Sequence, residues 1–244
     1  MSELIHGHID GREVRVDRGA MALTAARELG LAVPTLCHHP GLPDEGSCRL
    51  CLVEIGGRLV ASCMYPMRED GFQMLTDSPA IRQARAFVLE LLVNRCPSSP
   101  RLLALAYEYG VEPESRFQAN DGNLCIRCGR CTRACEANGI TAISLVGRGW
   151  ARKVTGPFFQ PPETCIGCLA CASVCPTGHI HFTEAKGHRS IWGRDFELIH
   201  CPACGKMLGT AEQLSWLGLE PGPCPGCRHR ETAKGLRKAC PSEL

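Results

Sequence analysis

The distribution of apolar and polar residues at the start of the chain predicts a hairpin followed by one helix. Leu4–Ile9 and Glu13–Val16 are strand-like segments, and the Asp10-Gly11 pair between them is a hairpin turn signal. Apolar residues then keep helical spacing over Ala20–Leu29, and Gly30 ends that run. Strands and a helix therefore open the chain.

A second pair of strands is predicted after a cysteine-containing loop. Cys51–Ile55 and Arg58–Ser62 have strand character and flank the Gly56-Gly57 turn. Together with the first hairpin and helix they give the order ββαββ, which suits a β-grasp. We expect this domain to occupy residues 1–78.

Helical periodicity returns after residue 78. Ser78 is a good N-cap, Pro79 suits the first helical position, and the apolar residues of 79–94 line one face. A short helix over Leu102–Tyr109 follows, and the polar stretch 112–122 is typical of a linker. We expect residues 79–119 to form a helical linker.

The next segment contains an internal repeat of cysteine spacing, which indicates duplication within one domain at 120–184. An inserted hairpin, Ala142–Val146 and Trp150–Val154, separates the two copies. The copies are Cys125-x2-Cys128-x2-Cys131-x3-Cys135 and Cys165-x2-Cys168-x2-Cys171-x3-Cys175.

This spacing is typical of bacterial two-cluster ferredoxins, in which the fourth cysteine of each run binds the other cluster. We therefore predict two [4Fe–4S] clusters. The ligands expected for the first are Cys125, Cys128, Cys131 and Cys175. Those expected for the second are Cys135, Cys165, Cys168 and Cys171.

Composition supports metal binding over disulfides. The chain has 244 residues, 18 cysteines, 44% hydrophobic residues and a formal charge of +2. No secretory signal or membrane-length apolar run is visible, so we expect a cytoplasmic protein whose reducing surroundings favour thiolate ligands.

A different cysteine pattern lies in the expected β-grasp domain. It reads Cys37-x10-Cys48-x2-Cys51-x11-Cys63, which is not the plant-type ferredoxin spacing. A [2Fe–2S] cluster is the favoured occupant and a structural zinc ion is the alternative. With Pro34-Thr35-Leu36 before Cys37 and Gly46-Ser47 before Cys48, the segment resembles the [2Fe–2S] domain of the complex I 75-kDa subunit family.

The order of modules over residues 1–182 also resembles the diaphorase iron–sulfur subunits of NAD-linked hydrogenases and formate dehydrogenases. Those families carry a His-x3-Cys-x2-Cys-x5-Cys cluster site after the helix of 79–94. Here Asn94 to Ser99 offers only Cys96 and no histidine, so we expect that cluster to be absent. Cys96 and Cys240 remain outside the predicted sites.

The C-terminal segment 195–240 contains two further cysteine pairs, which are typical of a zinc ribbon. The same four sulfurs could hold a rubredoxin-like iron, so the metal stays open. The ligands expected are Cys201, Cys204, Cys224 and Cys227.

The predicted fold is α+β: a β-grasp [2Fe–2S] ferredoxin domain, a helical linker, a dicluster [4Fe–4S] ferredoxin domain and a small zinc ribbon. No dinucleotide fingerprint, P-loop or acid–base pair is evident, so no catalytic residue is assigned. The resemblance implies an electron-transfer subunit of an NAD(P)-linked oxidoreductase, between a flavin subunit and a catalytic subunit.

Two other functions stay open. One is an electron carrier or bifurcation-complex subunit serving a heterodisulfide-reductase-like or aromatic-ring reductase. The other is a redox-sensing regulator that uses the zinc ribbon, although the near-balanced charge and 5% aromatic residues argue against nucleic-acid binding.

Overall fold

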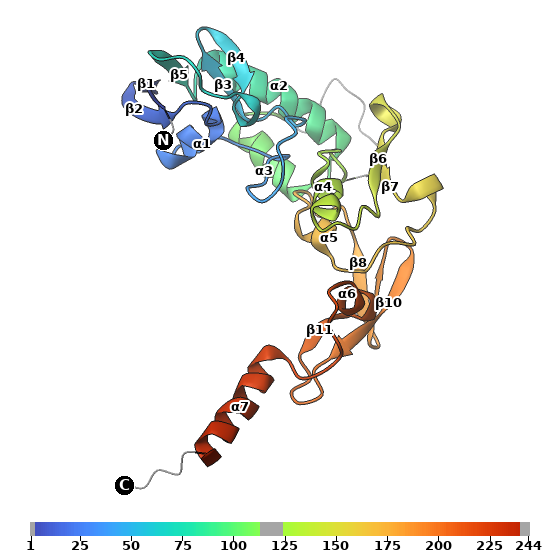
Figure 1. Cartoon of the computed structure of the whole chain (residues 1–244). Helices are drawn as coiled ribbons and strands as arrows, with labels where there is room; N and C mark the ends of the chain where they lie inside the picture. The colour runs from blue at the N-terminus through green and yellow to red at the C-terminus, as the bar shows by residue number, and fades with distance from the viewer. Residues whose placement is uncertain (1–2, 113–123, 240–244) are drawn as a thin grey trace.

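The computed structural model describes residues 3–112 and 124–239 (Figure 1). Its N-terminal part is a mixed sheet with the strand order β2-β1-β5-β3-β4. The strands are β1 (Leu4–Ile9), β2 (Arg12–Asp17), β3 (Leu52–Ile55), β4 (Arg58–Ala61) and β5 (Phe72–Leu75). Helix α1 (Ala22–Glu28) packs its alanines and Leu23 against this sheet in one buried core.

The four predicted strands are present, but the fifth strand, β5, was not predicted. It pairs parallel with β1 and antiparallel with β3, so it joins the two predicted hairpins into one sheet. Phe72 and Met74 of β5 point into the core. β3 and β4 are equally short, but the Gly56-Gly57 turn between them signals a hairpin, whereas β5 takes its place by pairing with β1 and β3 without such a turn.

Two helices cover the cysteine loops of the N-terminal domain. Helix α2 (Pro79–Arg95) begins at the predicted cap, where the Ile81 amide donates to Ser78 Oγ at 3.3 Å. Helix α3 (Pro100–Glu108) packs against α2, and both contribute to a core that also contains Cys37, Cys48 and Cys128. The predicted linker at 112–122 lies almost entirely outside the described residues.

The repeated cysteine runs each lead into a short helix, α4 (Arg130–Ala137) and α5 (Ala170–Ser173), which contact each other. The inserted hairpin consists of β6 (Ser144–Val146) and β7 (Lys153–Thr155). It is shorter than predicted, because Gly149–Ala151 form a 3-10 turn, and Gly147 and Gly149 both have positive φ.

A second sheet follows, with the order β11-β10-β9-β8. Its strands are β8 (Phe182–Ala185), β9 (His188–Ile191), β10 (Arg194–His200) and β11 (Met207–Thr210). Helix α6 (Ala211–Trp216) packs on β10 and β11. Helix α7 (Pro225–Ala239) projects from the rest of the chain (Figure 1).

Within the two described ranges, no helix combines the length and the apolar character needed to cross a membrane.

Candidate iron–sulfur and metal sites

The sulfurs of the first predicted ligand set meet in the N-terminal domain. The Cys37 amide donates to Cys48 Sγ and the Cys48 amide donates to Cys37 Sγ, each at 3.4 Å. The Sγ atoms of Cys51 and Cys63 lie 3.4 Å apart, and the Cys63 thiol also hydrogen-bonds Cys37. All four cysteines are buried. The structure therefore brings this set together.

Hydrogen bonds among these thiols separate their pKa values. The thiols of Cys48 and Cys63 lower the pKa of Cys37 far below its usual range. The Cys63 thiol lowers the pKa of Cys51 to about 6, whereas the pKa values of Cys48 and Cys63 are raised by their hydrogen bonds to Cys37. Buried sulfurs that share negative charge in this way suit a cationic metal centre.

The loop that supplies the central pair of sulfurs is tightly wound. Gly46 has φ +65°, and a Cβ there would lie 2.7 Å from Met64 Cγ. Arg49 also has positive φ, 57°, and the Leu50 amide that follows donates to the sulfur of Cys48. Both the positive φ and the nearby Met64 side chain therefore favour glycine at position 46.

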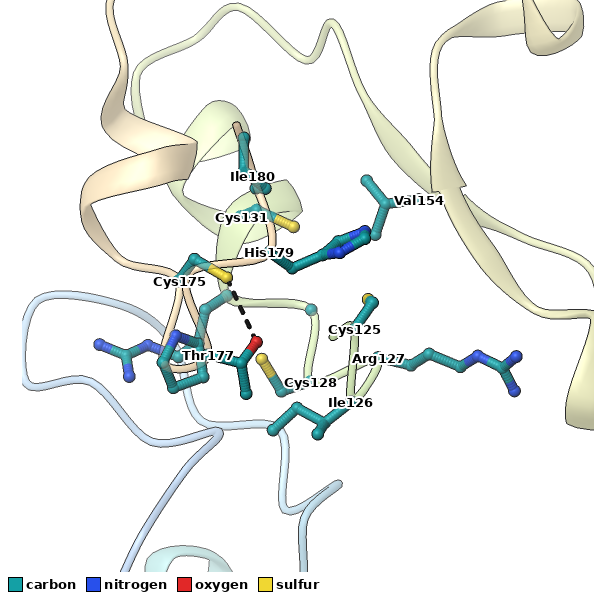
Figure 2. A pocket seen from close by; sticks show the side chains of 13 residues that line it. Cys125, Ile126, Arg127, Cys128, Cys131, Val154, Cys175, Thr177, His179 and Ile180 are labelled. Atoms are coloured by element: carbon teal, nitrogen blue, oxygen red, sulfur yellow. Dashed lines mark hydrogen bonds between the residues drawn. The ribbon is translucent and has the colours of Figure 1, made fainter. Parts of the chain in front are cut away.

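The repeat lines two separate cavities, each with about 340 Å³ of empty space that includes a part open to solvent. Cys125, Cys128, Cys131 and Cys175 line the first cavity. In Figure 2 the four sulfurs face a common space, with His179 and Ile180 at its edge. Three of these cysteines come from one run and the fourth comes from the other.

The second cavity has the complementary set. Cys135, Cys165, Cys168 and Cys171 line it, together with apolar residues such as Ile140. The Ala142 amide donates to Cys135 Sγ at 3.2 Å. The structure thus places the eight cysteines of the repeat in two groups of four, each with three cysteines of one run and one of the other.

The backbone conformation repeats along with the cysteines. Arg127 and Gly167 occupy equivalent positions and have φ of 58° and 66°. Gly129 and Leu169 are also equivalent, with φ of 70° and 63°. Alternating right- and left-handed residues point successive amides inward and create a concave site for a negatively charged group. The amide of Arg130, for example, donates to the sulfur of Cys128.

Burial disfavours free thiolates in both cavities. It raises the pKa of Cys125, Cys128 and Cys171 to about 11 and that of Cys131 to about 12. Thiolates are the form that binds iron, so the positive charge of a bound centre would have to offset this cost. The cavities, the sulfur donors and the inward amides fit [4Fe–4S] centres.

Cys175 differs from the other ligands of the first cavity. Burial raises its pKa, but hydrogen bonds from the amides of Thr177, Ile180 and His179 outweigh that effect and lower it. The Thr177 hydroxyl lies 3.7 Å from Cys175 Sγ (Figure 2). The backbone after Cys175 therefore stabilises a thiolate at this position.

The C-terminal cysteines form a fourth sulfur site. The sulfurs of Cys201, Cys204, Cys224 and Cys227 all lie within 4.8 Å of one another. Cys204 Sγ and Cys224 Sγ are 3.7 Å apart, close to the separation of about 3.8 Å that a tetrahedral centre with Zn–S bonds of about 2.3 Å requires. The Cys224 amide donates to Cys201 Sγ at 3.2 Å and lowers the pKa of Cys201 to about 6.

Sequence reasoning did not single out two side chains that contact the cysteine loops. Trp192 Nε1 donates to Cys171 Sγ at 3.4 Å, from the turn between β9 and β10. Arg133 donates to the carbonyl oxygens of Cys37 and Cys128 at 2.7 and 3.1 Å. Neither belongs to a local motif, because the contacts of Trp192 with Cys171 and of Arg133 with Cys37 join segments that are distant in the sequence.

Comparison with protein families agrees with this arrangement. Residues 2–79 match the model of the 2Fe-2S iron-sulfur cluster binding domain, and residues 119–182 match that of the 4Fe-4S dicluster domain. The fold and these matches define an iron–sulfur protein with one [2Fe–2S] domain and one [4Fe–4S] dicluster domain.

Similar chains define the family of this protein more closely. A subunit of the NADH-quinone oxidoreductase of Rhizobium meliloti is 32% identical over 81% of this chain and 26% of its own length. The alpha subunit of NADPH-Fe(3+) oxidoreductase from Geobacter sulfurreducens is 32% identical over 80% and 26%. The 75 kDa subunit of NADH-ubiquinone oxidoreductase from Reclinomonas americana is 35% identical over 60% and 25%.

A solved structure is also similar: a chain of the NAD+-reducing [NiFe]-hydrogenase in the H2-reduced state. It is 32% identical, with a TM-score of 0.56 over 63% of this chain and 75% of that chain. The protein therefore belongs to the iron–sulfur subunit family that includes these oxidoreductase and hydrogenase chains. It spans 25–26% of the length of the three curated relatives.

Proposed function

We propose that this protein is the electron-transfer subunit of a multi-subunit NAD(P)-linked oxidoreductase. It would hold one [2Fe–2S] cluster on Cys37, Cys48, Cys51 and Cys63, and two [4Fe–4S] clusters, one in each cavity of the repeat. The observation that carries the proposal is the division of the repeat's cysteines into two cavities, each lined by three sulfurs of one run and one of the other.

When bound, such clusters accept and release one electron at a time. The protein's part is to hold them in sequence and to set their potentials by burial and hydrogen bonding. The Cys37 and Cys48 loops share a core with Cys128, so the N-terminal ligand set adjoins the first cavity. Helices α4 and α5, which follow the two cysteine runs, contact each other, so the first cavity lies near the second.

The fourth site is proposed as zinc, held by Cys201, Cys204, Cys224 and Cys227. Zinc does not change its redox state, so it would stabilise a small segment and take no part in electron transfer. Only a few apolar side chains pack there: beside three of the cysteines, Leu208 alone among the described residues joins that core.

The proposed partners are a flavin- and NAD-binding subunit and a catalytic subunit, in a cytoplasmic complex. The test is anaerobic purification of the native complex, followed by mixing the isolated subunit with NADH or NADPH. We expect co-purification with a flavoprotein, and reduction of the clusters only when that flavoprotein is added. A protein isolated as a freely diffusing monomer, or one reduced by a different donor protein, would contradict the proposed partnership.

A further inference from the structure

Arg133 lies between the two cysteine loops that belong to different predicted clusters. It projects from α4, and its side chain is only 9% exposed. A single nitrogen, Nη2, donates to the carbonyl oxygen of Cys37 at 2.7 Å and to that of Cys128 at 3.1 Å. Cys37 belongs to the N-terminal ligand set and Cys128 to the first cavity.

The rest of the guanidinium binds the N-terminal loop. Nη1 donates to the carbonyl oxygen of Pro43, and Nε lies 3.3 Å from Glu45 Oε2. The Glu45 carboxylate in turn approaches Gly129, where a Cβ would lie 3.2 Å from its Oε2. One buried cation with one partly exposed counter-charge therefore holds both loops.

We propose that Arg133 is the positioning residue that couples the [2Fe–2S] site to the first [4Fe–4S] site. The inference rests on the proposed function, because it assumes that both sites hold clusters. Two hydrogen bonds through one nitrogen connect the backbones of a ligand from each set, so they fix the separation of the sites. The coupled step is an exchange of one electron, in which one site is oxidised, the other is reduced, and no bond forms or breaks.

The charge of Arg133 acts on both sites as well. A cation close to a cluster favours the form that carries the additional electron, so it raises the reduction potential. Glu45 opposes this effect from the other side of the guanidinium. Changes at these two residues should therefore move the same two potentials in opposite directions.

Arg189 provides a matched control. It is also a buried arginine paired with a glutamate, Glu184, at 2.6 Å, and it also donates to a cysteine-loop carbonyl, that of Gly167, at 2.6 Å. That loop belongs to the second cavity, whose ligand set does not include Cys37 or Cys128. A general effect of losing a buried arginine should therefore appear in both the Arg133 and the Arg189 variants. An effect on the coupling between the [2Fe–2S] site and the first [4Fe–4S] site should appear only in the Arg133 variants.

The experiment is an EPR-monitored redox titration of the full-length, cluster-loaded chain carrying Arg133→Gln, Arg133→Lys, Glu45→Gln or Arg189→Gln. Arg133→Gln should lower the potentials of the [2Fe–2S] site and the first [4Fe–4S] site together, and weaken the spin–spin broadening between them. Arg133→Lys should keep the potentials and lose the broadening, because one ammonium cannot replace the planar guanidinium. Glu45→Gln should raise both potentials.

The inference is overturned if Arg133→Gln leaves both potentials and the broadening unchanged. It is also overturned if Arg189→Gln lowers the same two potentials and weakens the same broadening. If the Arg133→Gln variant does not assemble its clusters, Glu45→Gln tests the inference instead, because that carboxylate is partly exposed and Arg133 remains. The inference is then overturned if neither potential rises. Failure of the proposed function has a separate signature, since the wild-type chain would then lack the [2Fe–2S] and [4Fe–4S] signals altogether.

Discussion

At the scale of single residues, each cysteine of the repeat lines one cavity and not the other. Cys168→Ser should remove the cluster of the second cavity, or about four of about ten irons, while the [2Fe–2S] EPR signal persists. The reason is that Cys168 lines only the second of the two repeat cavities. Iron analysis and EPR on the reduced protein measure both effects.

Cys96→Ala is the control for that substitution. Cys96 is fully buried in the core that α2 and α3 form, and it belongs to none of the four ligand sets. Its loss should leave the iron content unchanged and lower stability by about 1 kcal/mol through the small cavity it creates. A parallel loss of iron in Cys96→Ala, or disappearance of every EPR signal in Cys168→Ser, would contradict this separation.

Gly167 is a second residue with a specific prediction. Its φ is +66°, and a Cβ would lie 2.8 Å from Phe196 Cδ2 and 3.0 Å from Thr210 Cγ2. Gly167→Ala should therefore destabilise the second cavity by about 2–4 kcal/mol, from backbone strain and overpacking together. Thermal loss of visible absorbance should occur at a lower temperature than in the wild type.

Gly187→Ala isolates the backbone contribution. Gly187 also has positive φ, +80°, and lies in the turn between β8 and β9, with nothing within 4 Å of the added Cβ. We expect a loss of only about 1–2 kcal/mol there. Equal effects of the two alanines would show that Phe196 does not pack closely on the cysteine loop.

At the residue level, the sequence allows a prediction where the spacing of cysteines within a short loop is a local signal. The sequence indicates only part of the backbone conformation of these loops. Gly129 and Gly167 are consistent with positive φ, but Arg127 and Leu169 also have positive φ at the equivalent positions, and their residue types do not indicate it. Trp192 was missed because an indole N–H donor to sulfur has no spacing rule.

At the scale of elements, we expect α7 to depend on a metal ion at the fourth sulfur site. Cys224 precedes the helix and Cys227 lies in its first turn, and the residues from 225 to 234 are exposed apart from Cys227. Removing the metal with a chelator should therefore increase hydrogen exchange throughout α7 without changing the cluster EPR signals. The isolated helix is only marginally stable in water because it is short.

Cys204→Ser should have the same effect as the chelator. Cys204 lies in the first knuckle and is exposed, so its influence on α7 would pass through the bound metal. Ala203→Ser, an exposed neighbour in the same knuckle, is the matched control and should leave exchange unchanged. Protection of α7 that survives in Cys204→Ser would contradict a metal-dependent helix.

Element prediction from sequence was accurate for the two hairpins of the N-terminal sheet and for α2, whose cap and apolar face are both local signals. It missed β5 and all four strands of the second sheet, β8 to β11, which take their place from pairing with neighbouring strands. Phe196 shows the limit clearly: its burial follows from the contact between β10 and the Gly167 loop, which no local pattern specifies.

At the scale of the whole molecule, the order of modules was predictable and their mutual contacts were not. The family matches cover residues 2–79 and 119–182, in the order that the cysteine patterns indicate. The contact between the first module and the second runs through Arg133, Glu45 and Ser47, whose hydroxyl donates to the Cys128 carbonyl at 3.4 Å. Polar contacts of this kind between distant loops leave no periodicity in a sequence.

The central claim is that one chain holds three iron–sulfur clusters and one zinc ion. Metal and acid-labile sulfide analysis, with EPR of the anaerobically purified and reduced protein, tests it most directly. The account predicts about ten iron and one zinc per chain, with both [2Fe–2S] and [4Fe–4S] signals. About six iron would contradict it, because one [4Fe–4S] cluster would be missing. About eleven iron without zinc would mean that the C-terminal cysteines bind iron, and about fourteen iron would mean that the chain holds an additional cluster.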